Sequence, residues 1–125
     1  MEIFFNLKKN IKTLGLDIWF NNHQNNEKAY FRKANFIVKF FEDKDYEVEN
    51  CVPIKIDKED LISLKDRCEL VIEKPERGPD LLPTCSGFFF GSTEYDDDYL
   101  YKVEDVLNWL NEEGDYDDVY LTIWY

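Results

Sequence analysis

The chain has 125 residues, of which 44% are hydrophobic and 17% aromatic, and it carries a formal net charge of −12. The length matches one domain, for which about 100–150 residues is typical, and the aromatic content excludes a disordered chain. The acidity excludes a broad basic face for nucleic acid and opposes binding to an anionic membrane. We therefore expect a single compact domain over residues 1–125 that binds neither nucleic acid directly nor a membrane.

The first half of the chain contains three strand-like segments and one helical segment. Residues 2–7 (EIFFNL), 16–20 (LDIWF) and 51–56 (CVPIKI) are short and rich in aromatic or β-branched residues, which is typical of strands. Between residues 28 and 42, apolar side chains recur at the helical period, so we expect a helix there. The apolar stripe of this helix consists of Phe31, Ala34, Ile37, Val38 and Phe41.

The second half continues the same mixture. Residues 57–73 have a helical apolar stripe, and residues 97–112 have another, with an acidic first turn that suits a helix N-terminus. Residues 87–91 (GFFFG) predict a short buried strand, and residues 119–125 (VYLTIWY) predict a last one. The connection between the first two strands is too short for a crossover helix. The sequence therefore predicts an α+β fold, with a mostly antiparallel sheet and about three helices packed on one face.

The negative charge is concentrated near the C-terminus. Residues 94–118 contain eleven acidic residues and one base, Lys102, whereas residues 1–93 carry a net charge of only −2. Such a field steers a basic protein partner toward the surface that bears it, although a solvated acidic face also simply keeps a protein soluble. The candidate partner-binding residues are Asp96, Asp97, Asp98, Glu104, Asp105, Glu112, Glu113, Asp115, Asp117 and Asp118.

The residue pattern predicts no catalytic site, no metal site and no cofactor. His23 is the only histidine, and one isolated histidine in a polar loop is weak support for a hydrolytic triad or a metal site. The acidic runs at residues 96–98 and 115–118 lack the spacing of a calcium-binding loop. The segment GFFFGST lacks the lysine of a phosphate-binding loop and the third glycine of a dinucleotide fingerprint.

The cellular location is predicted from the cysteines and the first residues. Cys51, Cys68 and Cys85 form no C-x-x-C pair, and their apolar surroundings indicate small buried thiols of a reducing compartment. The first ten residues have an acid at position 2 and too short an apolar run for a signal peptide. No apolar stretch reaches the ~20 residues that cross a bilayer. We expect a cytoplasmic protein.

Three segments together resemble a family of small, uncharacterised phage and prophage proteins. YFRKANFIVKFF resembles the family's [YW]-W-R-K-A-N-x-I-x-x-W-F helix, and LPTCSGFFFGSTEYDDDYL resembles its LPT-x-SGFFFGSTEYDE-x-Y block. DDVYLTIWY resembles its aromatic C-terminal strand, and the three segments occur in the same order within residues 28–125. The family tends to have His and Trp where this chain has Val38 and Phe40. The resemblance implies a phage or mobile-element origin, with residues 1–27 as an added N-terminal β-hairpin.

Two classes of function follow from these observations. The first is a binding protein: an inhibitor of a basic host nucleic-acid enzyme such as an RNA-guided defence nuclease, in the manner of an anti-CRISPR protein, or an immunity protein against a co-encoded toxin. The second is a small-ligand-binding or enzymatic domain with a pocket built by SGFFFGSTEYD, although the same segment is also typical of a strand leading into a helix cap. The candidate pocket residues are Arg32, Asn35, Ser86, Gly87, Gly91, Ser92, Thr93, Tyr95 and Asp96.

Overall fold

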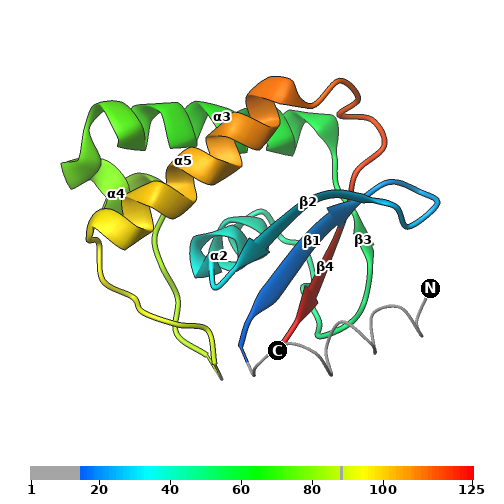
Figure 1. Cartoon of the computed structure of the whole chain (residues 1–125), viewed down its shortest axis with the longest axis horizontal. Helices are drawn as coiled ribbons and strands as arrows, with labels where there is room; N and C mark the ends of the chain where they lie inside the picture. Colours follow the sequence, from blue (N-terminus) through cyan, green and yellow to red (C-terminus); the bar gives the residue numbers. More distant parts are fainter. Residues whose placement is uncertain (1–14, 88) are drawn as a thin grey trace.

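The computed structural model of the chain describes residues 15–87 and 89–125, and it has an α+β fold (Figure 1). The described strands form one antiparallel sheet in the order β2-β1-β4-β3, and helices pack on one face of it. This confirms the predicted fold class. The elements in chain order are β1 (Asp17–Asn21), β2 (Glu27–Arg32), α2 (Asn35–Asp43), β3 (Ile54–Lys55), α3 (Lys58–Glu73), η1 (Pro75–Arg77), α4 (Gly78–Leu81), α5 (Asp97–Glu112) and β4 (Tyr120–Trp124).

The helix predicted over residues 28–42 is wrong in its first part. Residues 27–32 form β2, which pairs with β1 so that Phe31 lies opposite Ile18, and the helix begins only at Asn35. Lys33, with φ of +58°, reverses the chain between the two elements. Ala29 and Phe31 of β2 pack against the core, and pairing with the buried strand β1 satisfies the backbone groups on one side of β2, so the strand prevails over the helical pattern.

The strand predicted over residues 87–91 is also wrong, because the described residues of this segment, 87 and 89–91, form a loop. Phe89 and Gly91 have φ of +60° and +89°, outside the range of a strand. The loop is nevertheless fixed to the sheet, since the Phe89 carbonyl accepts a hydrogen bond from Leu16 N at 2.9 Å and the buried Phe90 ring lies 5.1 Å from the Tyr125 ring. The prediction of a buried strand fails in burial as well as in type, since Phe90 is buried but Phe89 is 45% exposed.

The remaining predicted elements are confirmed with small changes of bounds. The helices expected at 57–73 and 97–112 are α3 and α5, and the strands expected at 16–20 and 119–125 are β1 and β4. The strand expected at 51–56 shortens to β3, Ile54–Lys55. The strand predicted at 2–7 lies outside the described residues, as does most of the predicted hairpin over 1–27.

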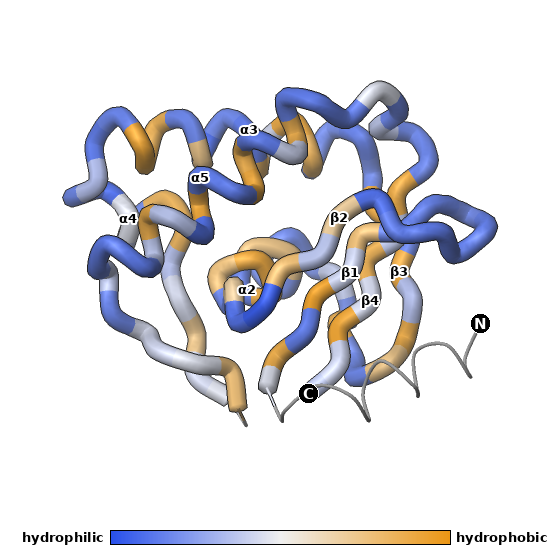
Figure 2. The backbone as a smooth tube through the Cα atoms, viewed as in Figure 1, coloured by the Kyte–Doolittle hydropathy of each residue, from blue (hydrophilic) through white to orange (hydrophobic). Residues whose placement is uncertain are grey.

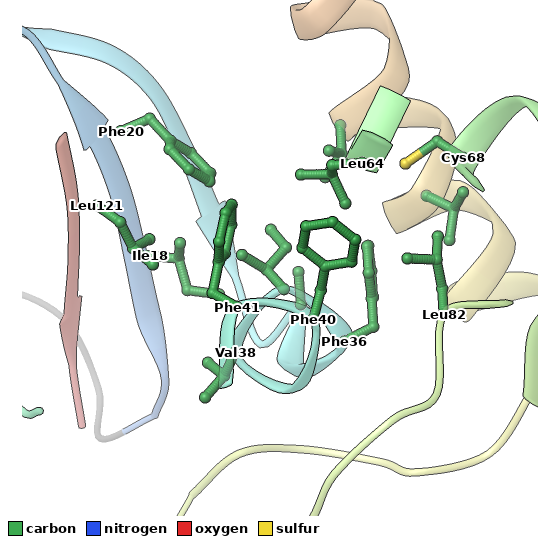
Figure 3. Close-up of a cluster of buried hydrophobic side chains, with 14 of the residues drawn as sticks. Ile18, Phe20, Phe36, Val38, Phe40, Phe41, Leu64, Cys68, Leu82 and Leu121 are labelled. Atoms are coloured by element: carbon green, nitrogen blue, oxygen red, sulfur yellow. The ribbon is translucent and has the colours of Figure 1, made fainter. Parts of the chain in front are cut away.

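Helix α2 occupies the centre of the molecule, between the sheet and the α3–α5 pair (Figures 1 and 2). Figure 3 shows Phe41 pointing toward Ile18 of β1, while Phe36 and Phe40 point toward α3 and the segment around Leu82. Phe36, Phe40 and Phe41 are all buried. Burying one phenylalanine contributes roughly 1.5–3 kcal/mol. This helix therefore joins the two halves of the core.

The cysteines differ in their surroundings. Cys68 is buried in the core, where burial raises the pKa of its thiol to about 12. Cys85 is half-buried, and Cys51 is exposed, so the prediction of a buried thiol is wrong at position 51. Cys51 follows the isolated bridge between Asn50 and Ile123 and has φ of +68°, which places it in a turn at the edge of the sheet.

Candidate functional site

Helix α5 divides its side chains between the core and solvent. Asp96 caps the helix, since its Oδ1 accepts a hydrogen bond from Tyr99 N at 3.0 Å, as the acidic first turn predicted. Val103, Val106 and Leu110 follow at helical spacing and are buried. Because this face packs inward, the acidic residues between them face outward.

Four carboxylates on the outer side of α5 are exposed and make no hydrogen bond or ion pair with any described residue. They are Asp97, Glu104, Asp105 and Glu112. Seven residues make about two helical turns, so Asp97 lies above Glu104 and Asp105 above Glu112, and the four residues share one side of the helix. A row of carboxylates without internal partners produces an outward negative field.

Three other predicted acids are engaged inside the protein. Asp98 pairs with Lys102 within α5. Glu113 pairs with Lys28 of β2 at 3.0 Å, and Asp118 lies 2.9 Å from His23 Nδ1. Glu113 and Asp118 connect the segment between α5 and β4 to the β1–β2 hairpin, and we assign these two a structural role. The Asp98–Lys102 pair stays within one helix.

Glu113 is the most fully bonded acid of this group. Its carboxylate accepts hydrogen bonds from Lys28 Nζ, from Trp109 Nε1 and from the backbone N–H of Asp115. Burial alone raises the pKa of Glu113, but these hydrogen bonds outweigh it and hold the pKa below its ordinary value. The side chains of Asp115 and Asp117 are exposed on the loop that follows, where Asp115 Oδ1 accepts a hydrogen bond from Asp117 N.

Helix α3 adds acids that the sequence-based prediction missed. Asp66, Glu69 and Glu73 are exposed and have no partner among the described residues. α3 packs beside α5 (Figure 1). Burial raises the pKa of Tyr116, and the charges of Glu113, Asp66 and Glu69 raise it further, so these α3 carboxylates lie within electrostatic reach of the segment after α5. The helical stripe of residues 57–73 already indicated their outward orientation.

We call the outer sides of α3 and α5 the acidic face. It consists of Asp66, Glu69, Glu73, Asp97, Glu104, Asp105 and Glu112, together with three exposed apolar side chains, Ile62, Leu70 and Tyr101. Carboxylates and exposed apolar groups on one surface are the two ingredients of a protein-binding site, since charge orients the partner and apolar burial holds it.

The predicted pocket residue Asn35 holds the SGFFFGST loop in place. Its side chain is 2% exposed, and its Nδ2 donates to the carbonyls of Phe90 at 3.1 Å and Ser92 at 3.0 Å. Its Oδ1 accepts from Cys85 N at 3.2 Å. All hydrogen-bonding groups except one acceptor lone pair are used within the protein, as expected of a buried structural amide.

The other loop residues bond mainly to one another. Thr84 Oγ1 donates to the Thr93 carbonyl at 2.9 Å, and Thr84 N donates to the Tyr95 hydroxyl at 3.0 Å. Ser92 Oγ accepts from Glu94 N at 3.0 Å. The two bonds of Thr84 join the beginning of the loop to its end, just before α5 begins.

The two loop glycines meet neighbouring side chains, and the loop's serine faces solvent. A Cβ at Gly91 would lie 3.1 Å from the Lys33 side chain, and a Cβ at Gly87 would lie 2.9 Å from the Phe90 ring. Ser86 is exposed. These close approaches explain both glycines without a ligand.

One depression beside the loop lies wholly among the described residues, and it is small. This depression, lined by Asn35, Thr84, Ser92, Asp96 and other residues of the loop and α5, encloses about 10 Å³. That volume holds about one water molecule, whereas small-molecule sites occupy roughly 300–1,000 Å³. The depression therefore gives no support to the predicted ligand pocket.

Arg32, another predicted pocket residue, lies on β2 and does not take part in the hydrogen bonds between Asn35 and the loop. Its Nη1 donates to Asp17 Oδ1 at 3.0 Å, and the Tyr30 hydroxyl donates to the same carboxylate oxygen. Burial, followed by the hydrogen bond to Asp17, raises the pKa of Tyr30 to about 12. Arg32 thus neutralises a buried aspartate of β1.

Comparison with known proteins adds no family. No family model matches the chain, and neither a curated protein nor a solved structure matches it. Within residues 15–87 and 89–125, no group of three or more His, Cys, Asp or Glu side chains is arranged to hold a metal ion, and no helix has the length and apolar character needed to cross a membrane. The resemblance to phage proteins stays a prediction.

Proposed function

We propose that this protein is a small acidic binding protein of phage or mobile-element origin, which inhibits a basic host nucleic-acid enzyme through its acidic face. One observation carries the proposal: the seven carboxylates of the acidic face are exposed, and none of them makes a hydrogen bond or ion pair with a described residue. These carboxylates are therefore open to the cationic groups of a partner, which charge complementarity would steer toward them.

The geometry of α5 suits a binding groove for nucleic acid. With a rise of about 1.5 Å per residue, the carboxylates from Asp97 to Glu112 extend over roughly 22 Å. Nucleic-acid enzymes hold the phosphate backbone in a positively charged groove, and RNA-guided nucleases hold their heteroduplex in such a channel. A helix that bears a row of carboxylates presents the same sign of charge as the phosphate backbone.

The choice of a host defence nuclease as the target rests on the phage resemblance of the sequence. An immunity protein would use the same face toward a basic toxin, and the identity of the partner distinguishes the two. For the SGFFFGSTEYD segment we propose a fold-forming role, because the hydrogen bonds of Asn35, Thr84 and Ser92 all stay within the protein.

Affinity purification tests the proposal. The tagged protein is recovered from its own host cytoplasm at low salt and again at raised salt. We expect a basic nucleic-acid enzyme at low salt and much less of it at raised salt, since salt screens the exposed charges. Recovery of an acidic or neutral partner, or of a partner whose binding ignores salt, contradicts the proposal.

A further inference from the structure

Tyr101 is the most exposed large hydrophobic side chain in the described part of the chain, at 66%. It lies on α5, on the side opposite the buried residues Val103 and Val106. Among the described residues it makes no hydrogen bond and no ring contact. By contrast, the exposed Tyr95 bonds to Thr84 and packs on another tyrosine ring. Neither packing in the core nor a hydrogen bond to a loop explains why a tyrosine occupies position 101.

The neighbours of Tyr101 on the helix are carboxylates. Asp97 lies four residues before it, and Glu104 and Asp105 lie three and four residues after it, so each is a side-chain neighbour on the helix surface. All three are exposed and make no ion pair with the described residues. A solvent-exposed phenol ring, with carboxylates one turn before it and one turn after it on the helix, is therefore a feature distinct from the acidity of the helix.

We propose that Tyr101, Asp97, Glu104 and Asp105 form a recognition site for an arginine side chain of the partner. This inference rests on the proposed function and names the group that the acidic face recognises. A guanidinium is planar and weakly hydrated, so it stacks on the face of an aromatic ring while its N–H groups donate to carboxylates at the ring's edges. A lysine ammonium is strongly hydrated, and its point charge cannot make the same flat contact.

The chemistry fits a partner that binds nucleic acid. Arginines on such enzymes contact phosphates with two parallel N–H groups, and a carboxylate offers the same pair of acceptor oxygens. Ile62 and Leu70 on the outer side of α3, both 40% exposed, add apolar area to the acidic face. The partner segment is thus expected to carry arginine next to apolar side chains.

Two cationic peptides of equal length and charge test the site, one with arginines and one with lysines at the same positions. Calorimetric titration at low salt is expected to give the full-length protein roughly three- to fivefold higher affinity for the arginine peptide. Tyr101→Ala is expected to remove this preference, whereas Tyr101→Phe, which keeps the ring face, is expected to retain it.

A matched pair of charge variants completes the experiment. Asp105→Asn and Asp98→Asn change the net charge equally, but Asp98 is already engaged by Lys102. We expect Asp105→Asn to weaken binding of the arginine peptide more than Asp98→Asn does. Equal affinity for both peptides, unchanged in Tyr101→Ala, overturns the arginine site while the proposed function stands. No binding of either peptide also overturns it, and the affinity purification then decides the proposed function separately.

Discussion

Replacing Asn35 by alanine removes three hydrogen bonds at once. The Asn35 side chain bridges the N-terminus of α2 to Cys85, Phe90 and Ser92 of the loop, over distances of 3.0–3.2 Å. At about 1 kcal/mol net for each hydrogen bond, the loss is about 3 kcal/mol. A domain of this kind has a free energy of unfolding of about 5–15 kcal/mol, so the variant should fold with much reduced stability.

Urea denaturation followed by tryptophan fluorescence measures this change, and thermal unfolding gives a second estimate. A loss of 3 kcal/mol lowers the Tm of a domain of this size by roughly 10 °C. Asn111→Ala on the exposed side of α5 is the matched control, and we expect it to change stability by less than about 0.5 kcal/mol. A loss below about 1 kcal/mol in Asn35→Ala would show that the loop does not depend on this amide, and the fold-forming role would be refuted.

Three further predictions concern stability and reactivity. Gly91→Ala should lower the free energy of unfolding by roughly 1–2 kcal/mol, because φ is +89° at this position and the Lys33 side chain lies close to it. Gly114 has nothing within 4 Å of an added Cβ, so Gly114→Ala should not destabilise the protein. Equal losses of stability in the two variants, measured by thermal unfolding, would contradict this. Because the folded-state pKa of Glu113 is lowered, its stabilisation is complete above the unfolded value of 4.5 and is lost as pH falls through the folded value. Glu113→Gln should therefore be less stable than the parent protein at pH 7 in urea titrations, with a difference that narrows toward pH 3; a constant difference would contradict the assignment. A thiol reagent at pH 8 should label Cys51 first and Cys68 only on unfolding, and rapid labelling of Cys68 in folded Cys51→Ser would disprove its burial.

Helices α3 and α5 were predictable because several signals agree along each of them. The apolar period, an acid at the N-cap and acids in the first turn all indicate the same bounds, and the structure has them within one residue. The same period also predicts which acids of α5 face outward, so the acidic face was largely accessible from sequence. Tyr101 and the acids of α3 follow from the same period.

The errors arise where distant residues decide the structure. Of the predicted helical stripe only Phe31 lies within residues 27–32, and pairing with β1 makes this segment a strand. The loop at residues 87–91 is set by hydrogen bonds from Asn35 and Leu16, which lie more than fifty residues away in the sequence. No local pattern contains that information.

The same limit applies to the charges. Whether an acid is free or paired depends on bases far along the chain, since Lys28 reaches Glu113 and His23 reaches Asp118. The predicted set of ten acids therefore divides into structural and available members only when the chain is folded. The acidic face therefore contains fewer residues of α5 than the sequence predicted, because the paired acids are excluded. It also includes acids of a second helix, α3.

The central claim is that binding depends on where the negative charges lie and not on the net charge of the protein. Two variants of equal net charge test it. The first replaces the α5 row: Asp97→Asn, Glu104→Gln, Asp105→Asn and Glu112→Gln. The second replaces four exposed acids in the last turn of α2 and the segment that follows it, none of which belongs to the acidic face: Glu42→Gln, Asp45→Asn, Glu47→Gln and Glu49→Gln.

Binding of each variant to the enzyme recovered by affinity purification is measured by calorimetry at low salt. At about 0.5 kcal/mol for each lost charge contact, the α5 variant should bind roughly 30-fold more weakly than the parent protein, and the control variant should bind nearly as well as the parent. Equal weakening in both variants, or none in the α5 variant, would contradict binding through the acidic face.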